Sequence, residues 1–325
     1  MSTSTPTITQ AATVAASATR SCITATLGKY DQVPINDCRA VWLYSPSIAA
    51  AIIFAILFGI CTTRHIIQAV HYRMKFCWVI IQASAWETAG FTLRSIAAQH
   101  QISLGLYLPE ELLILLAPIW INAFDYMLLG RMIYYFLPEK HVFGLPATKF
   151  ALVFVLLDVS TFIIQSIGIV ISSSGQNETT KTLYFGIHVY MGGLALQEFC
   201  ILCFSGMVIK FHRRMFELEY DGTLKRQGKE NWRALTYTLY ASLTFISIRI
   251  IFRLVQFSSG LLSPIPTHEV YFYVLEAVPM LCALSAMNII HPGRTLVGPD
   301  ANFPGKGEKK VMQDMEARLS SGGRI

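Results

Sequence analysis

Seven long hydrophobic runs, separated by short polar segments, account for most of the chain. Each run is close to or above the roughly 20 residues that an α-helix needs to cross the hydrocarbon core of a bilayer. The pattern therefore predicts an all-α membrane protein with seven transmembrane helices. These predicted helices cover residues 44–63, 76–98, 108–136, 148–172, 182–209, 234–257 and 270–290.

Prolines mark features within and after these runs. Pro46 lies in the first turn of the first predicted helix, where its missing N–H is harmless. Pro118 lies inside the third predicted helix and predicts a kink there. The last run is followed by His291, Pro292 and Gly293, and a proline followed by a glycine predicts the end of a helix.

The composition is that of a protein whose main solvent is lipid. Of the 325 residues, 53% are hydrophobic and only 14% are charged, whereas soluble domains average about 25% charged residues. We expect one seven-helix domain at 41–293, preceded by a flexible Ser/Thr-rich leader at 1–40 and followed by a disordered basic tail at 294–325. The net charge of +6 is explained by membrane orientation and does not indicate a nucleic-acid partner.

Lysine and arginine fall unequally on the two sides that seven spans would create. Apart from Arg94, Arg249 and Arg253, 19 basic residues lie in loops, termini and helix ends on one side, and 4 lie on the other. Because cytoplasmic segments carry the excess of lysine and arginine, the richer set is predicted to be cytoplasmic. The N-terminus is then outside the cytosol, and the C-terminus is inside.

Three residues concern the outer side of this topology. Asn177 begins an Asn-Glu-Thr sequence, which is an N-glycosylation signal in a loop predicted to be outside. Cys22 and Cys38 lie in the leader, where an oxidising exterior would permit a disulfide between them without requiring it. The other cysteines lie in or beside hydrophobic runs, where a thiol usually acts as a small buried hydrophobe.

The hydrophobic runs contain charged side chains. A charge at the centre of a membrane helix costs roughly 3 kcal/mol on insertion scales, so such residues usually face a wet cavity or a partner on another helix. The stretch 82–94 carries Glu87 and Arg94 two turns apart. The other interior charges that we identify are Asp125, Asp158, Glu198, Arg249, Arg253 and Glu276, and Gln165 and Gln197 add hydrogen-bonding amides.

These interior charges have two interpretations. Arg249 and Arg253 lie one turn apart on one helix face, and their expected partners are Glu276 and Glu87. Such pairs can serve only to fix helix packing. Because interhelical polar contacts average about 0.6 kcal/mol, helix association does not require so many charges, and we favour a cavity that binds a substrate. The arginines suit a phosphate or carboxylate head group, whereas the midplane acids suit an ammonium group or a proton relay.

Other chemistries find little support in the sequence. Cys200 and Cys203 have the spacing of metal ligands, but they lie within one helix and lack a second pair, so no metal site is predicted. No phosphate-binding loop is visible, and we expect neither ATP nor another cofactor. Only His188 lies clearly within a predicted span, which disfavours an intramembrane metal-dependent hydrolase.

Short motifs follow one another in a specific order across the spans. They are 44–47 (YSPS), 87–94 (ETAGFTLR), 115–118 (LLAP), 126–131 (YMLLGR), 193–197 (GLALQ), 249–253 (RIIFR), 273–276 (YVLE) and 288–293 (NIIHPG). In this order and spacing the chain resembles the fungal lipid-translocating exporter family, also called RTA-like proteins. The resemblance covers about residues 44–298, and it rests on the whole series because no single motif is diagnostic.

This resemblance implies a seven-helix fungal membrane protein with its N-terminus outside. Members of the family are linked to export or flip-flop of sphingoid long-chain bases and to resistance to toxic amphiphiles, and some are associated with porphyrin or sterol-like compounds. The identity of the substrate does not transfer with the resemblance. Carried over position by position, the best site candidates are Glu87, Arg94, Asp158, Gln165, Gln197, Arg253 and Glu276.

We therefore expect a multi-pass membrane transporter, not an enzyme, that moves amphiphilic lipids such as sphingoid-base-like compounds and gives efflux or resistance. We place it in the plasma membrane in preference to an internal membrane. Its expected partners are membrane lipids and an amphiphilic substrate, and no oligomeric state is predicted. The alternative is a seven-helix receptor or sensor of lipid-like ligands, although the motifs that mark the common receptor class are missing from the third and seventh predicted helices.

Overall fold

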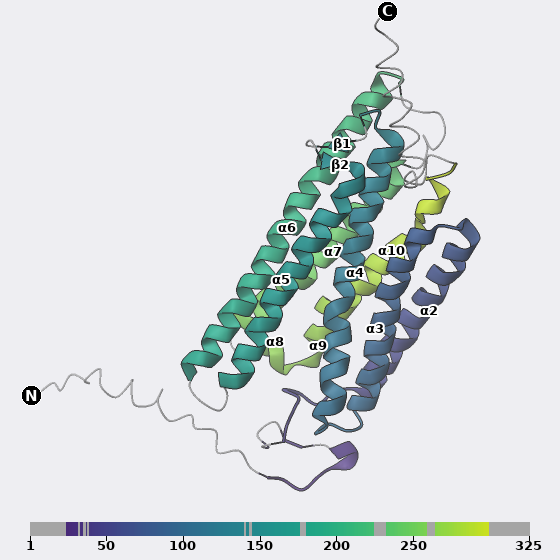
Figure 1. Ribbon diagram of the computed structural model, residues 1–325. Helices are drawn as coiled ribbons and strands as arrows, with labels where there is room; N and C mark the ends of the chain where they lie inside the picture. The colour runs from purple at the N-terminus through teal and green to yellow at the C-terminus, as the bar shows by residue number, and fades with distance from the viewer. Residues whose placement is uncertain are drawn as a thin grey trace, which may run out of the picture.

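In a computed structural model of the protein, long helices run side by side in one bundle (Figure 1). The structure describes residues 24–31, 33–34, 37, 39–139, 141–142, 145–175, 180–223, 232–258 and 264–298. Asn177, Cys22 and Cys38 lie outside these residues, so the glycosylation site and the disulfide stay predictions. Most of the predicted basic tail also lies outside them.

The helices follow the order of the hydrophobic runs. They are α2 (Ile48–Tyr72), α3 (Trp78–Ala97), α4 (Leu104–Phe136), α5 (Ala147–Gly175), α6 (Thr180–Tyr220), α7 (Trp232–Ser258), α8 (Pro264–Thr267), α9 (Glu269–Phe272) and α10 (Val278–Ile289). A π-helical turn, η3 (Tyr273–Ala277), joins α9 to α10, and short 3₁₀ turns are η1 (Lys29–Asp31), η2 (Lys75–Cys77) and η4 (Pro292–Arg294). Between α4 and α5, β1 (His141–Val142) pairs antiparallel with β2 (Leu145–Pro146).

Some predicted helix ends were wrong. The helix α2 begins after Ser47, whose side chain accepts a hydrogen bond from the N–H of Ala50, and it continues to Tyr72 instead of ending at residue 63. Similarly, α6 continues beyond residue 209 to Tyr220. Both extensions are more polar than the hydrophobic runs that they continue, so hydropathy alone does not reveal them. The prolines inside α4 leave its helical assignment unbroken.

Six helices among the described residues are long and apolar enough to cross a membrane. They are Ile48–Tyr72, Leu104–Phe136, Ala151–Ser172, Lys181–Tyr220, Trp232–Ser258 and Glu269–Arg294. The helix α3 is not in this set, because polar residues such as Glu87 and Arg94 lower its apolar character, yet its 20 residues pack between α2 and α4. The protein is therefore a multi-pass helical membrane protein, and a seventh crossing by α3 stays a prediction.

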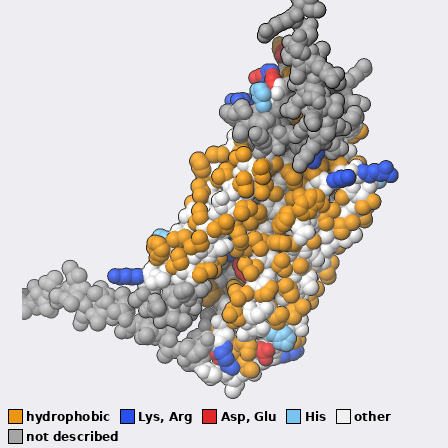
Figure 2. Space-filling view, in the orientation of Figure 1, with side chains coloured by type: hydrophobic (Ala, Val, Ile, Leu, Met, Phe, Trp, Pro, Cys, Tyr) orange, Lys and Arg blue, Asp and Glu red, His pale blue; other side chains and the backbone are white. Residues whose placement is uncertain are grey.

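Hydrophobic side chains cover the middle of the visible face of the bundle, and lysine and arginine lie toward its ends (Figure 2). Large exposed hydrophobic residues occur on α2, α5 and α6, such as Ile53, Leu152 and Phe199. In water, an apolar surface of this extent would be a liability. It is the surface expected of helices that face lipid.

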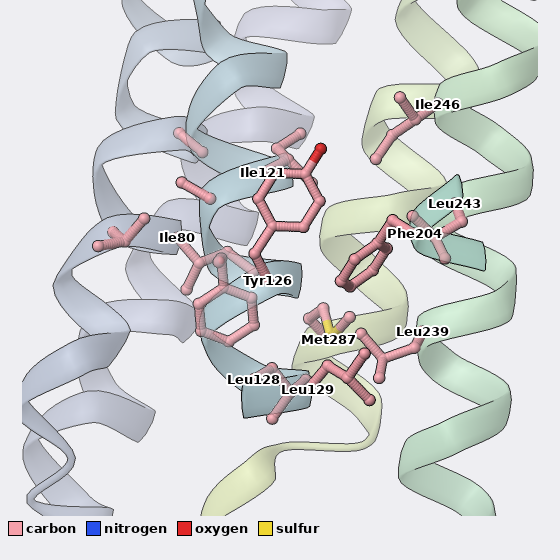
Figure 3. Packing of buried hydrophobic residues seen from close by; sticks show 14 of the residues in the cluster. Ile80, Ile121, Tyr126, Leu128, Leu129, Phe204, Leu239, Leu243, Ile246 and Met287 are labelled. Carbon is pink, nitrogen blue, oxygen red and sulfur yellow. The ribbon is translucent and has the colours of Figure 1, made fainter. Parts of the chain in front are cut away.

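The core is built around α4. In its most apolar stretch, 61% of the residues are buried, compared with 22% in α2. Figure 3 shows side chains of α4 packed among those of α3, α6, α7 and α10. Labelled there are Ile80, Ile121, Tyr126, Leu128, Leu129, Phe204, Leu239, Leu243, Ile246 and Met287. Polar residues on α4 are therefore held at the centre of the bundle.

Candidate functional site

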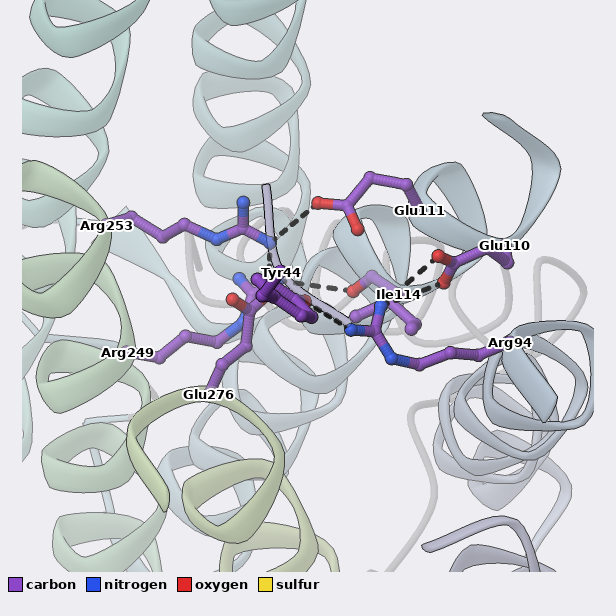
Figure 4. Close-up of polar contacts among 8 residues, drawn as sticks. All are labelled: Tyr44, Arg94, Glu110, Glu111, Ile114, Arg249, Arg253 and Glu276. Carbon is purple, nitrogen blue, oxygen red and sulfur yellow. Dashed lines mark hydrogen bonds and ion pairs between the residues drawn. The ribbon is translucent and has the colours of Figure 1, made fainter. Parts of the chain in front are cut away.

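Three arginines and four glutamates, linked by ion pairs, gather at one end of the bundle. We call these seven residues the ionic cluster: Arg94 of α3, Glu110 and Glu111 of α4, Arg249 and Arg253 of α7, Glu269 of α9 and Glu276 of η3. Figure 4 shows six of them with Tyr44 and Ile114. The cluster lies at the end of the bundle where the segment 41–44 also lies, opposite the end that carries β1 and β2 (Figure 1).

Glu276 binds both arginines of α7. Its Oε1 accepts hydrogen bonds from the Arg249 guanidinium at 3.0 Å and from the Arg253 guanidinium. These arginines share a helix face because they are four residues apart. Arg249 also donates to the backbone carbonyl of Ile114 at 3.2 Å, and Arg253 also donates to Glu111 at 3.2 Å. Both arginines are 5% exposed and Glu276 is 1% exposed, so this is a buried charge network.

Arg94 forms the other half of the cluster. It pairs with Glu110 at 3.2 Å, because the short turn from α3 to α4 brings the end of one helix beside the start of the next. Its guanidinium also donates to the Tyr44 hydroxyl at 2.5 Å and lies 4.0 Å from the ring centroid of Phe272. Arginine is suited to such sites because its planar group can donate hydrogen bonds and stack on rings together.

The chain before α2 covers this cluster. Trp42 is 7% exposed and lies 4.7 Å from the Arg94 guanidinium, measured to its ring centroid. Burial raises the pKa of the nearby Tyr44 to about 12, so its hydroxyl stays protonated. Trp42 and Tyr44 line both a cavity of about 80 Å³, which Arg94, Glu111 and Arg253 also line, and a cavity of about 310 Å³ that contains Gln101. These two aromatic residues therefore form a wall between the cavities.

The formal charges of the cluster do not cancel. Three arginines contribute +3 and four glutamates contribute −4, which leaves −1 when all are ionised. Every arginine of the cluster already has a carboxylate partner. An added anion would have to displace one of these carboxylates, whereas an added cation would complete the charge balance.

The predicted pairing was only partly right. The pairs from Arg249 and Arg253 to Glu276 are confirmed, but the expected pairing of these arginines with Glu87 was wrong, because Glu111 and the Ile114 carbonyl take their remaining hydrogen bonds. Glu110 and Glu111 were not among the interior charges identified from the sequence. They lie inside the predicted third helix, so the same test that found Glu87 would have found them.

Glu87 instead forms no side-chain hydrogen bond with another described residue. It lies two turns before Arg94 in α3 and is 1% exposed. Neither of its carboxyl oxygens has a hydrogen-bond partner in the described part of the chain. An ionised carboxylate without a partner is strongly disfavoured in a low-dielectric interior. The described surroundings of Glu87 therefore favour the neutral carboxylic acid over the carboxylate.

The other predicted site residues form separate contacts deeper in the bundle. Asp158 of α5 accepts hydrogen bonds at 2.9 Å from both the Asn122 amide and the Tyr126 hydroxyl of α4. Gln165 donates to Gln197 at 2.9 Å across the interface of α5 and α6. These hydrogen bonds link the residues to one another and not to the ionic cluster. The structure therefore separates the predicted residues into an ionic end and a polar middle.

Histidine and cysteine residues were also considered as candidates for a site. The expectation that only His188 lies in a span was wrong, because α2 extends past His65, which is 1% exposed. Cys200 is buried and Cys203 is exposed, so the pair does not converge on one site. In the described part of the chain, no group of three or more His, Cys, Asp or Glu residues is placed to hold a metal ion.

Comparison with known proteins places this arrangement in a family. Residues 80–298 match the family described as RTA1 like protein. The chain belongs to this family. The matched stretch contains every residue of the ionic cluster, Glu87 and Asp158, whereas Trp42 and Tyr44 precede it. No solved structure matches the chain.

Curated relatives carry transport names. The chain is 42% identical over 278 residues to the "Probable lipid transporter atnI" of Emericella nidulans, covering 84% of this chain and 72% of that protein. It is 28% identical over 281 residues to the lipid-translocating exporter-like protein RTA1 of Leptosphaeria maculans, covering 80% of this chain and 52% of that protein. A sphingoid long-chain base transporter of Saccharomyces cerevisiae is 22% identical over 290 residues, with 80% and 75% covered.

Proposed function

We propose that this protein is a transporter that moves amphiphilic lipids with a cationic head group across the plasma membrane. The observation that carries the proposal is the ionic cluster, which is mostly buried within a bundle of largely apolar helices and borders a cavity. The names of the relatives support lipid transport as the activity. The surplus carboxylate supports the choice of a cationic head group, such as the ammonium group of a long-chain base.

The topology of this proposal has seven spans within residues 41–293, including α3, with the N-terminus outside and the C-terminus in the cytosol. Its support is the 19-to-4 division of basic residues between the two sides. In this orientation the ionic cluster is in the outer half of the membrane. Asp158, Gln165 and Gln197 then lie nearer to its middle.

The proposed route begins at the ionic cluster and continues along α4. Arg94, Arg249, Arg253 and Glu276 shape the outer part and hold the helices around it. Glu87 is the next carboxyl group along α3. Farther along, the carboxyl group of Asp158 and the amides of Gln165 and Gln197 offer hydrogen bonds to a head group. The exposed hydrophobic surface lets the hydrocarbon tail remain in lipid.

Glu111 is the residue on which to test this route. It lines the cavity, its side chain is 27% exposed, and Arg253 is its ion-pair partner. Glu219 is a matched control, because its side chain is also 27% exposed and also pairs with an arginine, Arg233, outside the cluster. Transbilayer movement of a fluorescent long-chain base and of a fluorescent phosphatidylcholine would be followed in liposomes that contain each purified variant.

We expect wild type and Glu219→Gln to move the long-chain base faster than empty liposomes do. Glu111→Gln should slow that movement about tenfold, which corresponds to the loss of one charge contact of about 1.4 kcal/mol. Equal rates for wild-type and empty liposomes would reject transport, and ligand-dependent thermal stabilisation in that case would favour a receptor. Equal rates for both variants would mean that the cluster serves only to hold helices together.

A further inference from the structure

The carboxyl group of Glu87 lies near the ionic cluster but forms no hydrogen bond with it. The charged groups that act on it are Arg249 and Arg253 from α7 and Glu276 from η3. Glu276 pairs with both arginines and Glu111 pairs with Arg253, so two carboxylates already balance the two arginines and neither arginine is left to balance an ionised Glu87. The two helices packed on either side of α3 supply Thr62 of α2, which pairs with Thr88, and Glu110 of α4, which binds Arg94.

A buried acid without a partner can change its charge only if a cation or a proton accompanies that change. The neutral acid needs a proton, and the ionised carboxylate needs a counter-ion. The proposed substrate brings one positive charge in its ammonium head group. A proton and an ammonium group are therefore alternative partners of the same carboxyl group.

We propose that Glu87 is the exchange site of a proton antiporter, at which one proton leaves as one ammonium head group binds. This inference rests on the proposed function. On binding, the Glu87 O–H bond breaks, its proton passes to water on the side from which the substrate came, and the carboxylate pairs with the ammonium. On release, a proton from water on the opposite side re-forms the O–H bond. Each cycle exchanges one monovalent cation for one proton and moves no net charge.

The neighbouring acids do not fit this role as well. Asp158 already accepts two hydrogen bonds, from Asn122 and Tyr126, so its carboxyl group has partners without a substrate. Asp125 accepts a hydrogen bond from the Ser242 hydroxyl at 2.6 Å. Glu87 differs from both, because neither of its oxygens is held in the described structure. It also lies in the same helix as Arg94, two turns from the cavity that the substrate would enter.

The test uses the purified full chain in liposomes, with a pH-sensitive dye inside and the membrane potential clamped by potassium and valinomycin. The probes are a fluorescent long-chain base and a single-chain amphiphile with a quaternary ammonium head. The quaternary probe is permanently charged, so it cannot carry a proton through the lipid by itself. With the interior one pH unit more acidic, one-for-one exchange should concentrate this probe about tenfold inside and make the interior more alkaline.

Glu87→Gln preserves the shape of the neutral acid but cannot release a proton, so it should abolish both the accumulation and the proton movement. Glu87→Asp retains an acid and should retain exchange. Asp125→Asn is the control, since it makes the same chemical change at another buried carboxyl group and should behave as wild type. If the Glu87→Gln variant failed to fold, the response of wild type to the pH gradient would still show whether the protein exchanges protons for the probe, and Glu87→Asp would still test the site.

Suppose that both probes move faster than in empty liposomes, but at a rate that does not depend on the pH gradient and with no proton moving in the opposite direction. That result would overturn the inference and leave the proposed function standing. Exchange that persists in Glu87→Gln would overturn the assignment of the site. A protein that moves neither probe nor phospholipid faster than empty liposomes would instead contradict the proposed function itself.

Discussion

Replacing Glu276 with glutamine removes the one negative charge that is shared by two buried arginines. In the structure, Oε1 of Glu276 binds Arg249 at 3.0 Å and also binds Arg253. After the change, Arg253 keeps Glu111, which is 27% exposed. Arg249 keeps the backbone carbonyl of Ile114, which carries no formal charge. The variant therefore leaves a buried guanidinium without its counter-ion.

The size of the effect separates two physical descriptions. Removing one partner of a buried ion pair typically costs about 3–5 kcal/mol, whereas an average interhelical polar contact in a membrane is worth about 0.6 kcal/mol. Because Glu276 is 1% exposed, the first value applies, and we take about 3 kcal/mol. At about 2–4 °C per kcal/mol for a domain of this size, Tm should fall by roughly 10 °C.

Thermal unfolding of the purified protein in detergent measures this change. Glu219→Gln provides the comparison, since it breaks the exposed pair with Arg233 and should lower Tm only slightly. Adding Arg249→Met to Glu276→Gln removes the stranded cation and should restore part of the loss. The reasoning is refuted if Glu276→Gln lowers Tm no more than Glu219→Gln does, or if the double variant is less stable than the single one.

Two further predictions concern other parts of the chain. A Cβ at Gly168 would lie 2.5 Å from a backbone nitrogen of α6, whereas nothing lies within 4 Å of a Cβ at Gly192. Gly168→Leu should therefore reduce the yield of monodisperse protein in size-exclusion chromatography more than Gly192→Leu does. Equal yields from the two variants would contradict this packing. Hydrogen bonds from Arg39 hold the pKa of Asp37 well below its usual range, so this stabilisation of the segment is complete above the ordinary Asp pKa of about 3.9 and is lost as the pH falls through the lower folded value. The N–H of Ala25 donates to Asp37 at 2.8 Å, so hydrogen exchange at Ala25 should be slower than its intrinsic rate by a factor that changes little between about pH 5 and 8. Asp37→Asn should remove this protection across the whole range. Loss of the wild-type protection within this range would contradict the prediction.

Hydrophobic runs predicted the order of the long helices well, because each helix buries or exposes apolar residues around most of its circumference. They predicted the ends poorly. The hydropathy of α2 falls after residue 63 while its backbone continues to Tyr72, since helix formation does not stop where the membrane stops. Conversely, α3 is a complete 20-residue helix, but its hydropathy is lower than that of the other long helices because it carries polar residues that face the interior of the bundle.

Within the site, spacing predicted only contacts that depend on one helix face. Arg249 and Arg253 share a face, and their common partner Glu276 was predicted correctly. Spacing along the chain did not predict that Glu87 lacks a partner, because it does not tell which acceptors the arginines of α7 reach: the Ile114 carbonyl and Glu111 take their remaining hydrogen bonds. The cover of Trp42 and Tyr44 over Arg94 was likewise invisible, since it depends on how the chain before α2 folds back.

The central claim is that lipid head groups travel through the ionic cluster, and photocrosslinking tests it most directly. A long-chain base with a photoactivatable group next to its amine would be crosslinked to the protein in liposomes, and the labelled peptides identified by mass spectrometry. We predict labelling of residues that line the small cavity, such as Tyr107 and Phe272, which unlabelled long-chain base suppresses. Labelling confined to the lipid-facing groove of α5, lined by Ile163, Ile167 and Val170, would contradict the claim.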